Sequence, residues 1–453
     1  MEQISSSDTI CAISTPPGCG GIAVARVSGP DAFAIVDKIW SGKRLADAKS
    51  HSAHFATIKD ADGQALDEAV ATVFRNPRSF TGEDTVEISV HGSIYIQQQL
   101  LRSLVAAGAR MAEPGEFTRR AFANGRLDLA EAEAVADMIA SSSRAAHRLA
   151  ISQLQGRFSS HINELRDRLV TLASLLELEL DFSEEDVTFA DREKLRQLAE
   201  DVKSTVDRLA ASFASGQAIR EGIPVAIIGE PNVGKSRLLN ALLDSDRAIV
   251  SDIPGTTRDT VEDTVDIDGT LFRFIDTAGL RSTDDPVEQL GIARALDKAA
   301  KARIVLWVMT PDNYAHAAGA EAQLRTAMSD DAALIKVVNK IDLAADPSAY
   351  QDTKISALTG TGLDDLKQLI AKSITADLPA DESMIVTNAR HHQALLKASQ
   401  ALADLLAGLA LLLTPDLLAE HLRESIHHLS TITGTISSQE ILNTIFSRFC
   451  VGK

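Results

Sequence analysis

The segment VAIIGEPNVGKSRLLNALL contains the residues best suited to chemistry in this sequence. An apolar run at residues 225–228 leads into residues 229–236, which match GxxxxGKS, and an amphipathic stretch follows. Glycines let backbone N–H groups approach phosphate oxygens, and the N-terminus of a following helix favours negative charge. Lys235 is then placed to reach the β- and γ-phosphates, and Ser236 to bind Mg²⁺. The pattern predicts a strand, a phosphate-binding loop and a helix.

The motifs that accompany such a loop in GTP-binding domains follow in order. DTAG at residues 276–279 comes after an apolar run, where an Asp linked to Mg²⁺ and an amide for the γ-phosphate belong. VVNKID supplies Asn339, Lys340 and Asp342, and SAL occupies residues 356–358. The Asp carboxylate can accept hydrogen bonds from N1–H and N2–H of guanine, which adenine cannot supply. The order and spacing predict a GTP-specific domain.

Between the first two motifs lies SDIPGTTRD, whose Thr257 is placed to join the Mg²⁺ shell as a switch residue. The complete set of predicted GTP contacts consists of five segments: Asn232, Val233, Gly234, Lys235, Ser236 and Arg237; Ser251, Asp252, Ile253, Pro254, Gly255, Thr256 and Thr257; Asp276, Thr277, Ala278 and Gly279; Asn339, Lys340, Ile341 and Asp342; and Ser356, Ala357 and Leu358.

Two residues indicate how this GTPase differs from Ras-like enzymes. Leu280 stands where those enzymes carry the Gln that orients water, so either hydrolysis is feeble or another residue positions the water. Glu288 is the nearby carboxylate candidate, and a solvated surface Glu is the alternative. Asn232, inside the loop, could hold a monovalent cation that supplies positive charge beside the phosphates, or it could only hydrogen-bond the loop.

The composition narrows the class of protein. The 453 residues are 45% hydrophobic and carry a net charge of −18, which argues against nonspecific binding of nucleic acid or membrane by the whole surface. Three cysteines predict a reducing cytoplasm rather than a disulfide framework. The first ten residues show no secretion signal. The apolar run at residues 405–413 is too short for a membrane span and predicts a buried helix face.

Hydrophobic periodicity divides the chain into parts that must position these residues. Strand-like alternation with turns predicts a mixed α+β domain over residues 1–121, and long Ala- and Leu-rich helical periodicity covers residues 122–221. Alternating strands and helices over residues 222–376 predict an α/β GTPase domain, and helical periodicity returns over residues 377–453. The fold class is therefore multidomain α/β plus α, with a Ras-like P-loop domain inserted into a discontinuous helical domain.

Several stretches outside the GTP motifs carry a more specific resemblance. These are DTICAISTPPGCGGIAVARVSG, SFTGEDTVEISVHG, PGEFTRRAFANGRLDLAEAEAVADMI and the terminal FCVGK. With them, the whole chain resembles the MnmE (TrmE) family of bacterial tRNA-modifying GTPases. The resemblance implies a cytoplasmic homodimer that works with the FAD-dependent protein MnmG (GidA) in a heterotetramer. Together they would add an aminomethyl or carboxymethylaminomethyl group to C5 of the wobble uridine of certain tRNAs, with a tetrahydrofolate derivative (5-formyl- or methylene-tetrahydrofolate) as one-carbon source.

The resemblance also implies a folate-binding N-terminal domain that mediates dimerisation. Its folate contacts would be Arg26, Glu87, Arg126 and Lys453. A carboxylate suits the amide-like edge of a pterin, and arginine suits an anionic folate tail. The alternatives from the residues alone are that Arg126 pairs with Asp128 and that Arg26 sits on a strand edge.

The same family comparison implies a cation-dependent mechanism. Potassium would be surrounded by Asn232, Ser251, Ile253 and Thr256, and magnesium by Ser236 and Thr257. Glu288 would orient the attacking water, and Arg258 would stabilise the switch or, less favoured, act as a finger in cis. Potassium and GTP would bring the two GTPase domains of a dimer together.

The C-terminal thiol, Cys450, has two interpretations. By itself it is a small buried hydrophobe that anchors the last helix. The resemblance implies instead that the helical domain returns the tail to the folate region, where a thiolate could act as a nucleophile or proton relay if neighbours lower its pKa.

Two rival functions share the GTP motifs. One is a GTPase switch in ribosome assembly without covalent chemistry, and the other is a scaffold with a degenerate GTPase. The intact motif residues argue against the scaffold, and the acidic composition shows no obvious basic RNA-binding module. For tRNA contact, residues 110–126 carry Arg110, Arg119, Arg120 and Arg126, a mild basic patch that is better interpreted as a solvated face.

Overall fold

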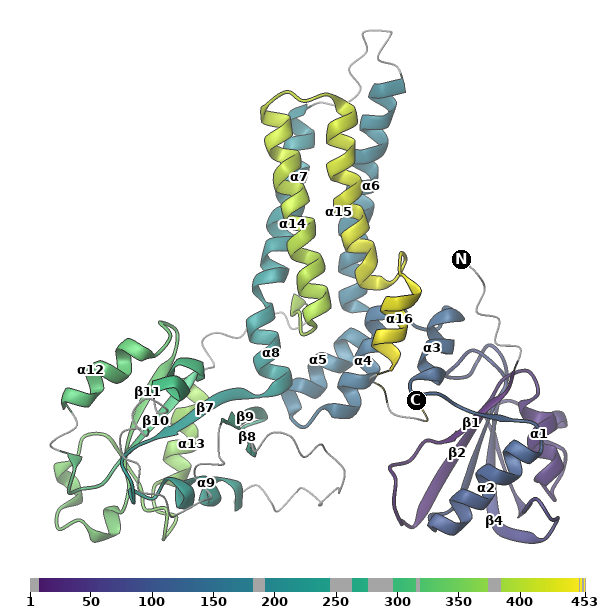
Figure 1. The fold of residues 1–453 in the computed structure, drawn as a ribbon, viewed down its shortest axis with the longest axis horizontal. Coiled ribbons are helices and arrows are strands. Elements are labelled where there is room, and N and C mark those ends of the chain that lie inside the picture. The colour runs from purple at the N-terminus through teal and green to yellow at the C-terminus, as the bar shows by residue number, and fades with distance from the viewer. Residues whose placement is uncertain are drawn as a thin grey trace. The chain divides into compact units, whose positions relative to one another are not determined.

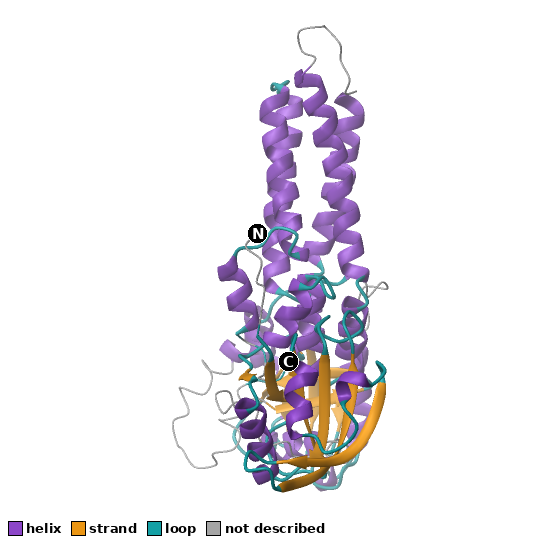
Figure 2. Cartoon of the chain, turned by 90° about the vertical axis from the view of Figure 1, so that its right-hand side faces the viewer, coloured by secondary structure: helices purple, strands orange, loops and turns teal. Residues whose placement is uncertain are grey.

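A computed structural model describes residues 8–181, 192–244, 263–275, 296–314, 318–373 and 384–447, together with residues 449 and 452 (Figure 1). The chain divides into two units, and each is described separately. The first comprises Met1–Ala136, Gln153–Ala199 and Ala401–Lys453, and the second comprises Asp137–Ser152 and Glu200–Gln400. Helices dominate residues 116–221 and 389–446, and the strands form two sheets. Figure 2 shows the helices in purple and the strands in orange.

The N-terminal part of the first unit is a mixed sheet with helices on one face. The strand order is β3-β4-β5-β2-β1-β6, antiparallel except for the pair β1–β6. The strands are β1 (Ile10–Ile13), β2 (Ile22–Ser28), β3 (Ser52–Lys59), β4 (Ala65–Phe74), β5 (Thr85–His91) and β6 (Arg110–Met111), and the helices are α1 (Ala32–Ile39) and α2 (Ile94–Ala106).

Side-chain alternation in these strands creates two different faces. Ala23, Ala25 and Val27 of β2 pack in one core with residues of α1 and α2. Because successive side chains of a strand point to opposite faces, the residues between them belong to the other face. That face carries Arg26, and it also exposes Ile22 at 69% and Phe55 at 68%.

The helical segments follow the sheet and resume near the C-terminus. In the first unit, α15 packs along α6, and a reciprocal pair of bonds between Asp128 and Glu131 caps α4. In the second unit, Phe213 of α8 stacks on His392 of α14. The helices are α3 (Glu116–Ala123), α4 (Leu129–Ala140), α5 (Arg144–Leu154), α6 (Arg157–Asp181), α7 (Arg192–Ala211), α8 (Phe213–Glu221), α14 (Ala389–Ala410), α15 (Pro415–Thr433) and α16 (Gln439–Phe446).

The α/β part of the second unit is built on a mainly parallel sheet. The strand order is β12-β11-β10-β7-β9-β8, with only β8–β9 antiparallel. Its two faces carry separate apolar clusters, as expected for a sheet covered on both sides. The elements are β7 (Ile223–Ile228), α9 (Lys235–Asp244), β8 (Asp263–Ile267), β9 (Thr270–Phe274), β10 (Ile304–Met309), α12 (Ala318–Ala327), β11 (Ala333–Val338), β12 (Thr353–Lys354) and α13 (Leu363–Lys372).

The observed parts confirm the predicted fold class, with one local correction. The run at residues 405–413 is only partly a buried helix face: Leu405 and Leu409 are buried, but α14 ends at Ala410. Leu411 and Leu412 are each 74% exposed, because the chain turns there and Leu412 adopts a positive φ of 56°. Within the described ranges, every helix is too short or too polar to cross a lipid bilayer.

Candidate functional site

The phosphate loop joins the end of β7 to the start of α9. Gly234 has a φ of +96°, and a Cβ at this position would lie 2.4 Å from Nδ2 of Asn339. Gly229 is equally constrained, since a Cβ there would lie 2.2 Å from the carbonyl oxygen of Val308. Only glycine lets the backbone come this close to its neighbours. The main chain of residues 229–234 therefore lies directly before the N-terminus of α9, and we call this loop the cradle.

The charged side chain of the loop folds over this cradle. Nζ of Lys235 donates hydrogen bonds to the carbonyl oxygens of Gly229 and Glu230, at 2.9 and 2.7 Å. Burial lowers the pKa of the Lys235 ammonium, and Lys298 lowers it further. An anion in the cradle would oppose both effects, because it favours the charged form of lysine. The cradle and Lys235 therefore fit phosphate groups.

Asn339 ties the phosphate loop to the predicted base-binding segments. Its Nδ2 donates to the carbonyl oxygen of Val233 at 2.8 Å, and its Oδ1 accepts from the amide of Ala357 at 3.0 Å. Lys340 turns the chain with a φ of +61° into a short 3-10 helix, Ile341–Leu343, which contains Asp342. One buried amide side chain thus brings three sequence segments together: residues 232–237, 339–342 and 356–358.

Asn232 occupies a special position in the loop. It is an exposed non-glycine residue with a φ of +63°. An amide side chain presented in this way is available to a ligand beside the phosphates.

Arg26 and Glu87 lie opposite each other on the adjacent strands β2 and β5. Nε and Nη2 of Arg26 donate to the same oxygen, Oε1 of Glu87, at 3.0 and 2.8 Å. The guanidinium carbon lies 5.1 Å from the ring centre of Phe80 and 5.6 Å from that of Phe117. The side chains of the pair remain 17% and 29% exposed. We call these four residues the Arg26 cluster.

Arg126 lies beside the loop that carries Phe80. Its side chain is exposed, and its Cγ would be 3.0 Å from a Cβ placed on Gly82. Asp128 does not pair with Arg126 anywhere in the described structure; its carboxylate accepts from the amide of Glu131 at the start of α4. Three of the four predicted folate contacts are therefore described, and two of them are in direct contact.

The end of the chain returns to strand β1. Ser14 Oγ donates to the carbonyl oxygen of Gly452 at 3.1 Å, and a Cβ on Gly452 would lie 2.2 Å from the carbonyl oxygen of Ile13. Strand β1 pairs with β2, which carries Arg26. Gly452 is thus a required glycine that holds the tail on the sheet of the Arg26 cluster.

Comparisons with known proteins cover nearly the whole chain. Residues 129–450 match the MnmE helical domain, and residues 9–126 match the GTP-binding protein TrmE N-terminus. A tRNA modification GTPase MnmE of Parabacteroides distasonis is 48% identical over 98% of this chain and 100% of its own length. Proteins with the same name from Cytophaga hutchinsonii and Bacteroides fragilis are 45% and 46% identical, each over 99% of this chain and 98% and 100% of their own lengths.

The chain belongs to the MnmE family. Within this MnmE chain, the remaining predicted site residues lie outside the described residues: Ser251, Asp252, Ile253, Pro254, Gly255, Thr256, Thr257, Arg258, Asp276, Thr277, Ala278, Gly279, Glu288, Cys450 and Lys453.

The two described cysteines of the MnmE chain, Cys11 and Cys19, differ in environment. Cys11 is buried in β1, and burial raises the pKa of its thiol to about 11. It therefore stays protonated at neutral pH and acts as a small apolar residue. Cys19 is exposed in the loop between β1 and β2.

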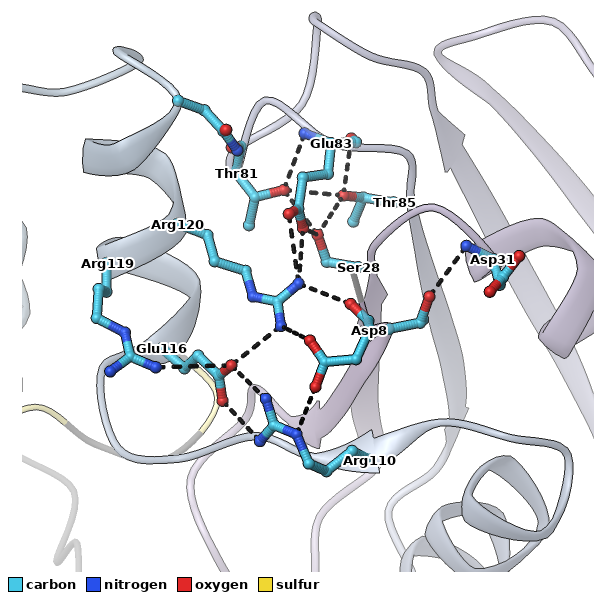
Figure 3. A network of polar contacts seen from close by, with 12 residues as sticks. Asp8, Ser28, Asp31, Thr81, Glu83, Thr85, Arg110, Glu116, Arg119 and Arg120 are labelled. Carbon is cyan, nitrogen blue, oxygen red and sulfur yellow. Dashed lines mark hydrogen bonds and ion pairs between the residues drawn. The ribbon is translucent and has the colours of Figure 1, made fainter. Parts of the chain in front are cut away.

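Sequence reasoning missed a buried ionic network in the N-terminal part of the MnmE chain (Figure 3). The predicted solvated face at residues 110–126 is wrong at its centre, since Arg120 is 3% exposed and Glu116 is 2% exposed. Glu116 accepts hydrogen bonds from Arg110 and Arg120, at 2.6 and 3.0 Å. Arg120 is therefore paired inside the protein, whereas Arg110 is paired with Glu116 and Asp8 while its side chain stays 44% exposed.

Two carboxylates of the network, those of Glu116 and Asp8, have lowered pKa values that favour their charged form. Burial by itself raises the pKa of Glu116, but hydrogen bonds from Arg110, Arg120 and the amide of Glu113 outweigh it and the net pKa lies below its usual value. The same two arginines lower the pKa of Asp8 despite partial burial. Only the spacing of four residues between Glu116 and Arg120 was visible in the sequence, because Asp8 and Glu83 are distant along the chain.

Proposed function

We propose that this chain is a potassium-activated GTPase that modifies tRNA together with an FAD-dependent partner, MnmG. It would add an aminomethyl or carboxymethylaminomethyl group to C5 of the wobble uridine, with a one-carbon unit from a tetrahydrofolate derivative. The observation that carries the GTPase part is the junction at Asn339, which joins the phosphate cradle to the NKID and SAL segments.

The residues of the nucleotide site have separate roles in this proposal. Asp342 accepts the two N–H groups of guanine, and the backbone amide of residue 357 or 358 meets guanine O6. Lys235 leaves the carbonyl oxygens of the loop and binds the β- and γ-phosphates. The amides of the cradle stabilise the negative charge that develops during phosphoryl transfer. Glu288 orients the attacking water.

Two cations complete the proposed nucleotide site. Ser236 and Thr257 bind Mg²⁺, and Asn232, Ser251, Ile253 and Thr256 bind K⁺; when bound, both ions supply positive charge beside the phosphates. The exposed amide of Asn232, held at a positive φ, supports its role as the potassium ligand from the loop. Arg258 stabilises the switch segment.

The Arg26 cluster is the proposed folate site. Both bonds from Arg26 use Oε1 of Glu87, and no other described residue bonds Oε2, so that oxygen can accept N–H groups of a pterin. Arg126 and Lys453 bind the anionic parts of the ligand. Gly452 is held on β1, and Cys450 stands two residues before it in the sequence. A thiolate there can act on the one-carbon unit.

The proposal includes an assembly and a location. A homodimer is supported by the exposed apolar side chains of Ile22 and Phe55 on the face of the sheet opposite to α1 and α2. The dimer would bind MnmG in a heterotetramer in the cytoplasm, where tRNA is found. GTP and potassium would bring the two GTPase domains together, and hydrolysis would release them.

Reconstitution of the modification tests this function. The full chain is mixed with MnmG, FAD, GTP, K⁺, methylenetetrahydrofolate and a tRNA transcript with uridine at position 34, with ammonium and glycine offered separately. Nucleoside mass analysis should detect the modified uridine only in the complete mixture. Omission of folate and substitution Lys235→Ala serve as controls.

Unmodified uridine in every mixture, despite GTP hydrolysis, would contradict the proposal. Nucleotide-dependent binding of this chain to a ribosomal subunit would then favour the alternative, a GTPase switch in ribosome assembly.

A further inference from the structure

We propose that Arg120 is a positioning residue for the Arg26–Glu87 pair. Its hydrogen bonds and ion pairs in the described structure go to Asp8, Glu83 and Glu116 rather than to Arg26 or Glu87. Instead it joins helix α3 and the loop at residues 80–84, the two segments that place aromatic rings over the Arg26 guanidinium. The consequence for ligand binding rests on the proposed folate function, whereas the geometric claim does not.

Arg120 connects three segments through one guanidinium group (Figure 3). Nη1 donates to the carbonyl oxygen of Asp8 at 2.9 Å and to both carboxylate oxygens of Glu83 at 3.3 Å. Nη2 donates to Oδ1 of Asp8 at 2.8 Å and to Oε1 of Glu116 at 3.0 Å. Such a planar fork can bind several carboxylates at once, which a lysine ammonium does with less directional control.

The partners of Arg120 flank the two aromatic rings. Glu116 directly precedes Phe117, which is fully buried, and Glu83 lies three residues after Phe80. The rings therefore sit at the two ends of one ionic bridge. Any shift of α3 away from the loop would change the distance of at least one ring from Arg26.

The network also reaches the strand that carries Arg26. Ser28 Oγ donates to Oε2 of Glu83 at 2.8 Å and lies 2.7 Å from Oγ1 of Thr81. Residues 26 and 28 of β2 are two apart and share a face of the sheet. Arg120 is thus linked to the loop, the helix and the strand that together surround the Arg26 side chain.

Loss of the Arg120 guanidinium would leave three carboxylates without their shared cation. Glu116 would keep its bonds from Arg110, but the ion pair that connects Glu83 to α3 would be lost, so the helix and the loop would no longer be bridged. The rings would then cover Arg26 less well. If Arg120 served stability alone, the Arg26 environment would not change in the protein that remains folded.

Chemical labelling of Arg26 tests the geometric claim in the full chain. Phenylglyoxal reacts with accessible arginines, and peptide mass mapping gives the rate at Arg26. We expect Arg120→Met to raise this rate about fivefold, which corresponds to about 1 kcal/mol less free energy to expose Arg26. Phe117→Leu removes one ring but no charge, and it should also raise the labelling rate of Arg26. This variant replaces Arg120→Met in the test if Arg120→Met does not fold.

Arg119 provides a matched control on the same helix. It contacts Glu113 at 3.3 Å and Glu116 at 3.7 Å, and the ion pairs of its side chain do not extend to the loop at residues 80–84 within the described structure. Arg119→Gln should leave Arg26 labelling within about twofold of wild type. Unfolding temperature and GTP hydrolysis verify that each variant is folded. An unchanged labelling rate in folded Arg120→Met would overturn the inference, and if that variant does not fold, an unchanged rate in Phe117→Leu would overturn it.

Folate affinity distinguishes this inference from the proposed function. The dissociation constant for 5-formyltetrahydrofolate should be about tenfold higher in Arg120→Met than in the wild type. In the double variant it should be close to that of Arg26→Lys alone, since Arg120 acts through Arg26. Additive losses would contradict positioning. If the wild type binds no folate but labelling of Arg26 increases, the folate function is wrong and the positioning role stands.

Discussion

The phosphate loop is held by backbone geometry, whereas Arg26 is held by side chains from several separate segments. Gly229 and Gly234 allow main-chain contacts that a Cβ would block, and Asn339 fixes the loop from one neighbouring segment. Around Arg26, Asp8, Glu83, Glu116 and Arg120 form ion pairs across sequence separations of up to 112 residues.

Because they are held differently, the phosphate loop and the Arg26 cluster should respond differently to substitutions and to pH. A main-chain cradle offers amides that do not titrate, so its function should depend mainly on shape and on Lys235. An ionic network depends on charge balance, and loss of one member weakens the compensation of the charges that it paired with. Substitutions and pH should therefore separate the two sites.

Lys235→Ala should give the largest difference between the nucleotide site and the Arg26 cluster. Loss of the ammonium that meets the phosphates should reduce kcat for GTP hydrolysis about 100- to 1000-fold. Folate affinity should stay within about twofold, because Lys235 lies in the other unit. Phosphate release and folate titration check both values. A parallel loss of folate binding would show that the two sites are not independent.

Gly234→Ala should test the shape of the cradle. The new Cβ would lie 2.4 Å from Asn339 Nδ2 in a backbone conformation that alanine disfavours. We expect GTP affinity to fall about 10- to 100-fold, as for about 1–3 kcal/mol of strain. Titration with a fluorescent GTP analogue measures it. Gly63→Ala, with a φ of +81° but nothing within 4 Å, is the control for backbone strain alone.

Acid should destabilise the N-terminal network before it affects the cradle. The pKa of Glu116 is depressed in the folded protein, so its stabilising contribution is present above the ordinary value of 4.5 and is lost as pH falls through the lower folded pKa. Each proton contributes a slope of up to about 1.4 kcal/mol per pH unit. We expect the free energy of unfolding, measured by urea titration at several pH values in this window, to change less steeply with pH in Glu116→Gln than in the wild type. An identical slope would contradict the assignment.

Asp128→Ala should have the smallest effect. It removes the cap of α4 and should lower the free energy of unfolding by about 1 kcal/mol. Both GTP hydrolysis and folate affinity should remain unchanged, since Asp128 does not pair with Arg126. Thermal unfolding and the two activity measurements check this. A selective loss of folate affinity would reinstate Asp128 as a partner of that site.

The sequence indicated a nucleotide site because each motif that would form it is a short, continuous segment. GxxxxGKS, NKID and SAL are short segments whose order reflects the parallel strand order, and β7 and β10 are buried apolar runs. The role of Asn339 as the link between them could not be seen, since it depends on how β11 and the loop at residues 356–358 meet.

The Arg26 cluster was only partly predictable. The family resemblance indicated Arg26 and Glu87, but not the rings of Phe80 and Phe117. The charged residues at 110–120 look solvated in the sequence, because nothing local shows that Asp8 and Glu83 supply their counter-charges. Partners from distant segments are visible only after the fold brings them together.

The most direct test of the central claim is GTP hydrolysis by the purified full chain in potassium and in sodium at equal ionic strength, with Asn232→Ala measured in parallel. We expect a large acceleration that is specific to potassium and is lost in Asn232→Ala, because that amide is presented beside the phosphate cradle. Equal rates in both salts would remove the cation from the mechanism and contradict the proposed GTPase cycle.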